Sequence, residues 1–161
     1  MSYIGVYGLS VMGQSIALNI ANKNYSVSVY NKFSYNDTTK AFVDNRCKGL
    51  DVSGYEQLTD FIKSLDKPRR ILLMVTAGKV VDDIIEELVH IVEPGDIILD
   101  CGNSYYKDTI RRESMLIKKK IYFFGVGISG GEKGALKAFS QKENMCMTNT
   151  MTGIYVQTIK H

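Results

Sequence analysis

A glycine-rich turn near the start of the chain constrains the fold more than any other feature of the sequence. The turn reads Gly8-Leu9-Ser10-Val11-Met12-Gly13, between an apolar stretch at residues 3–7 and apolar residues at helical spacing over 16–21. A strand that passes through such a turn directly into a helix points backbone N–H groups outward at the positive end of the helix dipole, where a pyrophosphate can bind. The turn therefore predicts a nucleotide-binding site. The alternative is a tight strand-to-helix turn that binds no ligand.

The rest of the chain alternates strand patterns with helix patterns. Strands are predicted at residues 25–30, 50–52, 70–75, 96–100 and 121–125, and the clearest helices at residues 55–65, 80–92 and 104–118. This alternation predicts an α/β fold, a Rossmann-like doubly wound, mainly parallel sheet with helices on both faces. A length of 161 residues is suited to a single domain.

The end of the second predicted strand bears on the choice of cofactor. Folds of this kind that use NAD place Asp or Glu there, to accept a hydrogen bond from the ribose 2′-hydroxyl. This chain has Asn31, Lys32, Phe33 and Ser34 instead. Hydrogen-bond donors without a carboxylate favour a 2′-phosphate, so the sequence predicts NADP rather than NAD. The alternative is that Lys32 is only a surface lysine at a strand end.

Three further loops are expected at the carboxyl ends of predicted strands, where open α/β sheets bind ligands. The first is residues 76–78. The second contains Asn103, which offers a donor and an acceptor or else bonds its own backbone, and Ser104, which is predicted to cap the next helix. The third is a second glycine-rich loop at residues 127–134, in which Ser129 could hold an anion.

The helix at residues 80–92 is predicted to be scaffold. Its apolar residues recur at helical spacing, and its acidic residues are expected to face water: Asp82, Asp83, Glu86 and Glu87.

Composition excludes several other classes of protein. The net charge of +3 arises from 20 basic and 17 acidic residues spread along the chain, which argues against nucleic-acid binding. Cys47, Cys101 and Cys146 lack the spacing of a zinc site or a disulfide framework and fit buried thiols in a reducing compartment. No apolar run reaches the length of a membrane span, and no signal peptide is evident. We expect a cytoplasmic protein without a metal site or a membrane partner.

Four blocks of sequence together resemble one enzyme family. They are GLSVMGQ from Gly8, KPRRILLMV from Lys67, DCGNSYYKDTIRR from Asp100 and GISGGEKGA from Gly127. They resemble the N-terminal domain of 6-phosphogluconate dehydrogenase, the decarboxylating, NADP-dependent enzyme, more closely than the wider β-hydroxyacid dehydrogenase group. The resemblance covers residues 3–136. It implies an NADP-binding Rossmann domain at residues 1–136, followed by a divergent tail at residues 137–161.

The resemblance also implies roles for individual residues. The pyrophosphate of NADP would be held by Gly8, Leu9, Ser10, Val11, Met12 and Gly13. The adenosine 2′-phosphate would be surrounded by Asn31, Lys32 and Phe33, and the cofactor site lined by Val75, Thr76 and Ala77. The nicotinamide ribose and the substrate, 6-phosphogluconate, would both be contacted by Asn103. The substrate would also be bound by Ser129, Gly130 and Gly131. The family usually has Arg and Thr where Lys32 and Phe33 stand, so a lysine point charge would replace a bidentate contact.

Residues 137–161 depart from the family pattern. The family continues with a helix that bears a catalytic Lys and with a helical domain that supplies a catalytic Glu and most of a homodimer interface. None of these motifs follows Leu136 here, although residues 153–159 could form a short strand. We therefore expect no catalytic residue in this chain, which would bind NADP without turnover. Two alternatives remain: a non-catalytic NADP-binding module that acts on a full-length partner, and a fragment of a related β-hydroxyacid dehydrogenase.

Overall fold

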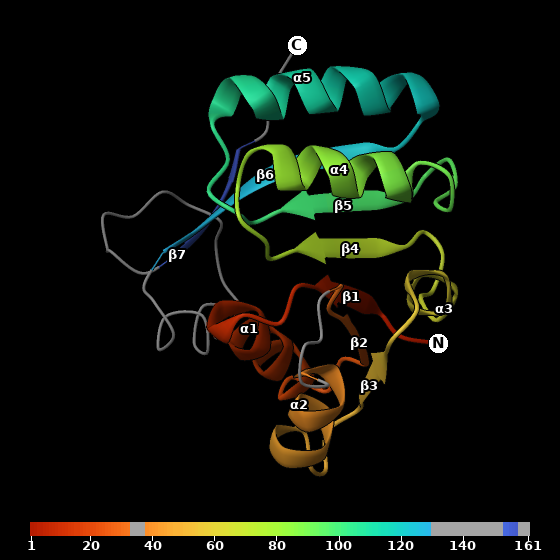
Figure 1. Cartoon of the computed structure of the whole chain (residues 1–161), viewed down its shortest axis with the longest axis vertical. Coiled ribbons are helices and arrows are strands. Elements are labelled where there is room, and N and C mark those ends of the chain that lie inside the picture. Colours follow the sequence, from red (N-terminus) through yellow and green to blue (C-terminus); the bar gives the residue numbers. More distant parts are fainter. Residues whose placement is uncertain (33–37, 130–152, 158–161) are drawn as a thin grey trace.

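The described residues form one twisted sheet covered by helices (Figure 1). The structure is a computed structural model that describes residues 1–32, 38–129 and 153–157. The strand order is β3-β2-β1-β4-β5-β6-β7. Strands β1 to β6 pair in parallel, and β7 pairs antiparallel with β6. The predicted Rossmann-like, mainly parallel α/β fold is confirmed.

The elements alternate along the chain in the predicted order. The strands are β1 Ile4–Tyr7, β2 Val27–Tyr30, β3 Val52–Tyr55, β4 Arg70–Leu73, β5 Ile97–Asp100, β6 Tyr122–Ser129 and β7 Gly153–Gln157. The helices are α1 Val11–Ala21, α2 Thr38–Arg46, α3 Leu58–Lys63, α4 Lys79–Leu88 and α5 Tyr106–Leu116, with a 3₁₀ turn at Ile117–Lys119.

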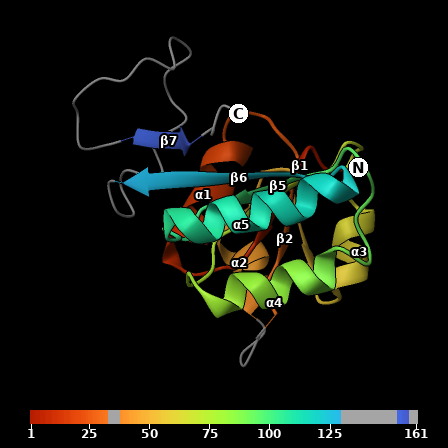
Figure 2. The ribbon, with the colours of Figure 1, turned by 90° about the horizontal axis from the view of Figure 1, so that it is seen from above.

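Each face of the sheet carries its own apolar core. Because side chains alternate along a strand, neighbouring residues of β1 such as Val6 and Tyr7 enter opposite cores. One core contains the buried sides of α1 and α2, and the other contains those of α3, α4 and α5. Figure 2 shows α4 and α5 lying side by side and roughly parallel. Helices therefore cover both faces of the sheet.

Strand β6 is longer than the sequence predicts. Residues 127–129, expected to open a glycine-rich loop, continue the strand, and that expectation was wrong. Gly125 pairs with Asp100 of β5, and the ladder then continues against β7, as far as Ser129 opposite Gly153. The partner strand lies within the segment where a short strand was one of two expectations. Gly130 and Gly131 lie outside the described residues, so the rest of this predicted loop is not placed.

The start of α5 also differs from the expectation. The helix begins at Tyr106, and its N-cap is Tyr105, which makes no side-chain capping bond. Ser104 was expected to be the cap, but its hydroxyl instead donates to a carboxylate oxygen of Asp100 at 2.6 Å. The local capping bond is thus replaced by a bond that joins the loop to the end of β5.

A buried ion pair joins the starts of β4 and β5 at the amino edge of the sheet. The carboxylate of Asp96 accepts from the Arg69 backbone N–H at 2.7 Å, from the Arg69 guanidinium at 2.8 Å and from the Glu93 N–H at 2.9 Å. The exposed fractions of Asp96 and Arg69 are 1% and 7%. A charge buried this deeply is tolerated because all of these donors converge on it.

Replacing Asp96 with Asn should strongly destabilise the fold. The Asp96→Asn variant removes the buried carboxylate and leaves the Arg69 guanidinium with only the exposed Glu93 carboxylate as an ion-pair partner, which costs about 3 kcal/mol of unfolding free energy. Chemical denaturation measures this loss. Asp83→Asn is the matched control, because Asp83 pairs with Lys79 on the exposed surface of α4 and should change stability little. Equal effects of the two substitutions would contradict the structural role given to Asp96.

Candidate functional site

The candidate cofactor site lies between two neighbouring strands whose following helices cross opposite faces of the sheet. Strands β1 and β4 are neighbours, but α1 follows β1 onto one face while α4 follows β4 onto the other. In doubly wound sheets the crevice at this switch point, outside the carboxyl ends of the strands, is where ligands bind. The predicted cofactor residues lie in the loops after β1, β2, β4 and β5, so they share this edge.

The glycine turn requires both of its glycines. Gly8 has φ +101°, a conformation that other residues rarely adopt, and a Cβ there would lie 2.4 Å from the carbonyl oxygen of Met74. A Cβ on Gly13 would lie 1.9 Å from the carbonyl oxygen of Gly8. Helix α1 thus starts in direct contact with the turn. Ser10 caps it by accepting from the Gly13 N–H at 3.5 Å, and Ser10 and Val11 are exposed.

The end of β2 is tied to this turn. The side-chain oxygen of Asn31 accepts from the Leu9 N–H at 3.2 Å, which brings two predicted cofactor residues together. Lys32 lies next to them, and its ammonium group forms an ion pair with Glu87 of α4. Glu87 was expected only to face water, and that expectation missed this contact. Phe33 lies outside the described residues.

The loops after β4 and β5 touch each other. A Cβ on Gly102 would lie 2.5 Å from the carbonyl oxygen of Val75, so only glycine allows this approach. Thr76 is exposed at the edge, and Val75 and Ala77 are half-buried. Asn103 is exposed and has φ +58°, the left-handed conformation that Asn adopts more readily than most residues.

Sequence analysis missed a cluster of charged residues behind these loops. The guanidinium of Arg112 in α5 is completely buried and bonds both oxygens of Asp82, an oxygen of Asp100, the Ser104 hydroxyl and the Gly78 carbonyl. We call these residues the Arg112 network. Asp82 was predicted to face water, and its side chain is 30% exposed, but the prediction missed its bonds to Arg112. A carboxylate at the end of an apolar strand, Asp100, was the signal in the sequence that could have indicated a buried cation.

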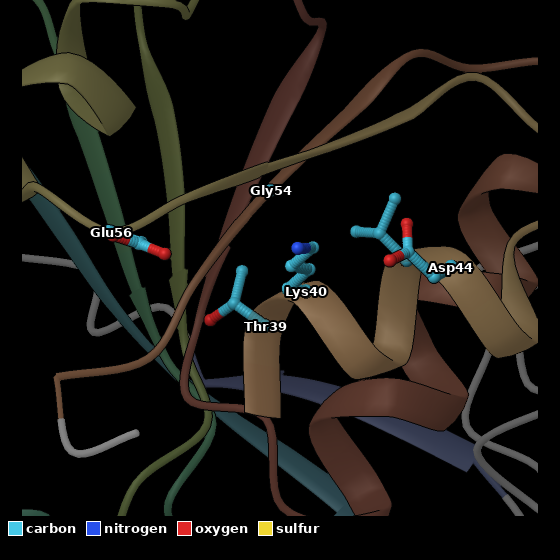
Figure 3. Close-up of a pocket in the computed structure, with 6 residues that line it drawn as sticks. Thr39, Lys40, Asp44, Gly54 and Glu56 are labelled. Atoms are coloured by element: carbon cyan, nitrogen blue, oxygen red, sulfur yellow. The ribbon is translucent and has the colours of Figure 1, made fainter. Parts of the chain in front are cut away.

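One cavity on the described part of the chain adjoins the predicted site, and another lies apart from it. One, of about 320 Å³, opens beside Asn103 at the carboxyl edge and is lined by Asp100, Asn103, Ser104, Thr109, Gly125, Val126 and Gly127. The other, of about 360 Å³, lies between α2 and β3 and contains none of the predicted site residues (Figure 3). Its side chains carry both signs of charge, from Lys40, Asp44 and Glu56. The first cavity adjoins the predicted site and supplies room for a ligand next to Asn103.

Of the two cysteines that the structure describes, Cys101 lies beside the site, and its thiol is not poised as a nucleophile. Cys101 follows β5 directly, and burial, helped by the Asp100 carboxylate, raises the pKa of its thiol far above the usual value. The thiol is therefore protonated at neutral pH. Among the residues that the structure describes, no cluster of His, Cys, Asp and Glu could hold a metal ion. Likewise, no helix within those residues is long and apolar enough to cross a membrane.

The donors at the edge fit an anionic dinucleotide. The first N–H groups of a helix have no partner within it, and those of α1 follow the glycine turn at the switch point, with the exposed Ser10 beside them. Asn31 and Lys32 add a polar group and a positive charge on one side. On the other side, Thr76 and Asn103 stand exposed. Strand order, turn and donors together define a dinucleotide-binding Rossmann domain.

Comparison with known proteins identifies the family. The family model described as the NAD binding domain of 6-phosphogluconate dehydrogenase matches residues 3–141. The chain belongs to this family, as the sequence blocks predicted. A decarboxylating 6-phosphogluconate dehydrogenase of Bacillus licheniformis is 54% identical over 134 residues, which are 83% of this chain and 28% of that protein.

Other relatives differ in the cofactor that their names give. Bacillus subtilis has one 6-phosphogluconate dehydrogenase named NAD(+)-dependent, 53% identical to this chain, and one named NADP(+)-dependent, 49% identical. Each match covers 83% of this chain and 28% of the relative. The chain therefore spans little more than a quarter of the length of these relatives.

Solved structures agree with the fold. Plasmodium falciparum 6-phosphogluconate dehydrogenase, solved in its apo form and with NADP+ or 6-phosphogluconate, matches with a TM-score of 0.77 and 37% identity, over 83% of this chain and 28% of that one. The 3-hydroxyisobutyrate dehydrogenase of Mycobacterium tuberculosis matches with a TM-score of 0.71 but only 17% identity, over 86% of this chain and 44% of that one. The second likeness shows the fold alone.

Acid should weaken the fold through Asp82. Hydrogen bonds from Arg112, assisted by Arg111, hold the pKa of the Asp82 carboxyl below its usual value. The unfolded chain protonates Asp82 near pH 4, whereas the folded chain does so only at lower pH. Stability from this group is therefore present above about pH 4 and lost as pH falls through the folded pKa.

Denaturation of the wild type and of Asp82→Asn at several pH values tests this expectation. The wild type should be more stable at neutral pH, and the difference between the two proteins should shrink below about pH 4. A constant difference across that range would contradict the ion pairs assigned to Asp82.

Proposed function

We propose that this chain binds NADP as the cofactor-binding part of a 6-phosphogluconate dehydrogenase. The observation that carries the proposal is the end of β2, where Tyr30 is followed by Asn31 and Lys32 and not by a carboxylate. Asn31 is already joined to the glycine turn by the hydrogen bond from the Leu9 N–H. A 2′-phosphate beside the turn would therefore meet a positive charge and an amide.

Each predicted residue has a place in this proposal. Residues 8–13 hold the pyrophosphate, and Asn31, Lys32 and Phe33 surround the 2′-phosphate. Residues 75–77 line the site on the α4 side. Asn103, exposed and beside the cavity of about 320 Å³, contacts the nicotinamide ribose and the substrate. Ser129, Gly130 and Gly131 bind 6-phosphogluconate from the end of β6.

The residues of this chain are suited to binding the cofactor and not to the acid–base steps of the reaction. When bound, NADP accepts a hydride from the substrate. The chain's own residues bind and orient: helix N–H groups and Lys32 neutralise phosphate charge, and Asn103 offers a donor and an acceptor. We assign no general base or acid among them. In the proposal a separate helical domain supplies the catalytic Lys and Glu, the rest of the substrate site and the homodimer interface. The relatives are long enough to contain such a domain, because the match covers only 28% of their length. This chain then binds cofactor without turnover.

The proposal also covers the compartment in which the chain works and the partners that it has. The chain works in the cytoplasm, in keeping with the free, buried thiols of Cys47 and Cys101, which a reducing compartment preserves. It acts on a small-molecule substrate and has neither nucleic acid nor a membrane as partner, which the mixed charge supports.

NAD is the second candidate cofactor, and one contact favours it. The ammonium group of Lys32 already forms an ion pair with the carboxylate of Glu87, so a 2′-phosphate has to compete with that carboxylate for the positive charge of Lys32. A relative named NAD(+)-dependent is also 53% identical to this chain. A non-catalytic NADP-binding module is a third possibility, distinguished by co-purification with a full-length partner.

Calorimetric titration with NADP and then with NAD tests the proposal, and Lys32→Ala sharpens it. Removing a charged hydrogen bond to the 2′-phosphate should raise the Kd of NADP about tenfold or more and leave that of NAD unchanged. Lys63→Ala is the matched control, because Lys63 is exposed at the end of α3 near the opposite edge of the sheet.

Each outcome has a distinct meaning. Tighter binding of NADP, lost in Lys32→Ala, supports the proposal, while equal losses of NADP and NAD in that variant contradict the role of Lys32. If the chain binds NAD but not NADP, NAD takes the place of NADP as the proposed cofactor. Turnover of 6-phosphogluconate by the purified chain would overturn the assignment of catalysis to another domain.

A further inference from the structure

The loop that carries Asn103 is held from both sides by one carboxylate. Asp100 accepts from the Gly102 N–H at 3.1 Å through one oxygen and from the Ser104 hydroxyl at 2.6 Å through the other. These two partners flank Asn103 in the chain. The left-handed conformation of Asn103, φ +58°, is thus enclosed between two hydrogen bonds to the same side chain.

Arg112 in turn orients that carboxylate. One terminal nitrogen of its guanidinium lies 3.3 Å from Asp100 and 3.1 Å from the Ser104 hydroxyl. The other terminal nitrogen lies 2.9 Å from the carbonyl oxygen of Gly78, at the end of the loop that contains Thr76 and Ala77. A single side chain therefore joins the loop after β4 to the loop after β5.

The rest of the guanidinium is anchored in α4. The Nε of Arg112 lies 2.9 Å from one carboxylate oxygen of Asp82, and the other oxygen is 3.3 Å from a terminal nitrogen. All five N–H donors of an arginine are then used, and the side chain has an exposed fraction of 0%. Such a fork has a fixed planar geometry, which a lysine ammonium group does not reproduce.

We propose that Arg112 is a positioning residue for the nicotinamide half of the cofactor site, acting on Asn103 through Asp100 and Ser104. This inference rests on the proposed function. A doubly wound sheet binds a dinucleotide in two halves, and the end of β2 marks the half that takes the adenosine ribose. The loops after β4 and β5, which Arg112 joins, belong to the other half. Their alignment sets how well the second half of a dinucleotide is held.

The test compares a whole cofactor with a fragment. NADP spans both halves of the site, whereas adenosine 2′,5′-bisphosphate lacks the nicotinamide half. In the full chain, Ser104→Ala should raise the Kd of NADP about fivefold, the scale of one lost hydrogen bond. Arg112→Lys should raise it further. The Kd of the bisphosphate should stay unchanged in both variants. Arg111→Lys is the matched control: it lies next along α5 and also contacts Asp82, but it has an exposed side chain and no bond to the Asn103 loop.

A double-mutant cycle tests whether the Arg112 network, through Ser104, acts on cofactor binding by way of Asn103. If the network only positions Asn103, Ser104→Ala added to Asn103→Ala should weaken NADP binding no further than Asn103→Ala alone. Additive losses would overturn this route. Should Arg112→Lys fail to fold, Ser104→Ala and the cycle still decide the question.

The inference and the proposed function fail in different ways. Wild-type protein that binds neither NADP nor NAD would overturn both. Wild-type protein that binds the cofactor, with variants that weaken NADP and the bisphosphate equally or weaken neither, would overturn only the role of Arg112. If NAD proves to be the cofactor, NAD and AMP replace the two probes without changing the expected pattern.

Discussion

The candidate site depends on how closely α1 approaches the turn from which it starts. A Cβ on Gly13 would lie 1.9 Å from the Gly8 carbonyl oxygen, so the helix can begin there only if position 13 has no side chain. Gly8 in turn sits against the Met74 carbonyl and donates its N–H to Tyr30 of β2. One pair of glycines thus sets β1, β2, β4 and α1 at a common edge. This packing sets the direction of the α1 dipole and of its first N–H groups. The close approach of the backbone at Gly8 and Gly13 therefore determines where an anion can bind more than any charged side chain does.

Backbone constraints of this kind are visible in a sequence, and contacts across long separations are not. The glycine turn, the order of strands and helices and the loops after β4 and β5 follow from local pattern, and the structure has them. Ser104 was assigned to the helix beside it because capping is a local rule, but Asp100 competes for the same hydroxyl. Arg112 was passed over because arginines are usually exposed, and its burial depends on Asp82, which is 30 residues earlier in the chain. The end of β6 was missed because glycines carry little strand signal and its partner strand comes from the far end of the sequence.

Charge pairing divides the site into two unlike halves. On the β2 side, Lys32 and Glu87 are partly exposed, so their pair is weak and open to exchange with a ligand's phosphate. On the β5 side, Arg112 and Asp100 are fully buried, so their geometry is fixed before any ligand arrives. The half that we propose to distinguish NADP from NAD is therefore adaptable, while the half next to the cavity of about 320 Å³ is rigid.

Strand β7 lies outside the part of the chain that matches the family. The family match ends at residue 141, and β7 lies beyond it at Gly153–Gln157. The backbone of β6 from Val126 to Ser129 takes its ladder partner from that strand. Ser129 lies inside the matched region, whereas the strand that pairs with its backbone lies outside that region. The backbone position of Ser129 therefore depends on a segment that the family match does not cover, so a substitution within residues 153–157 can shift Ser129 without changing any residue of the matched region.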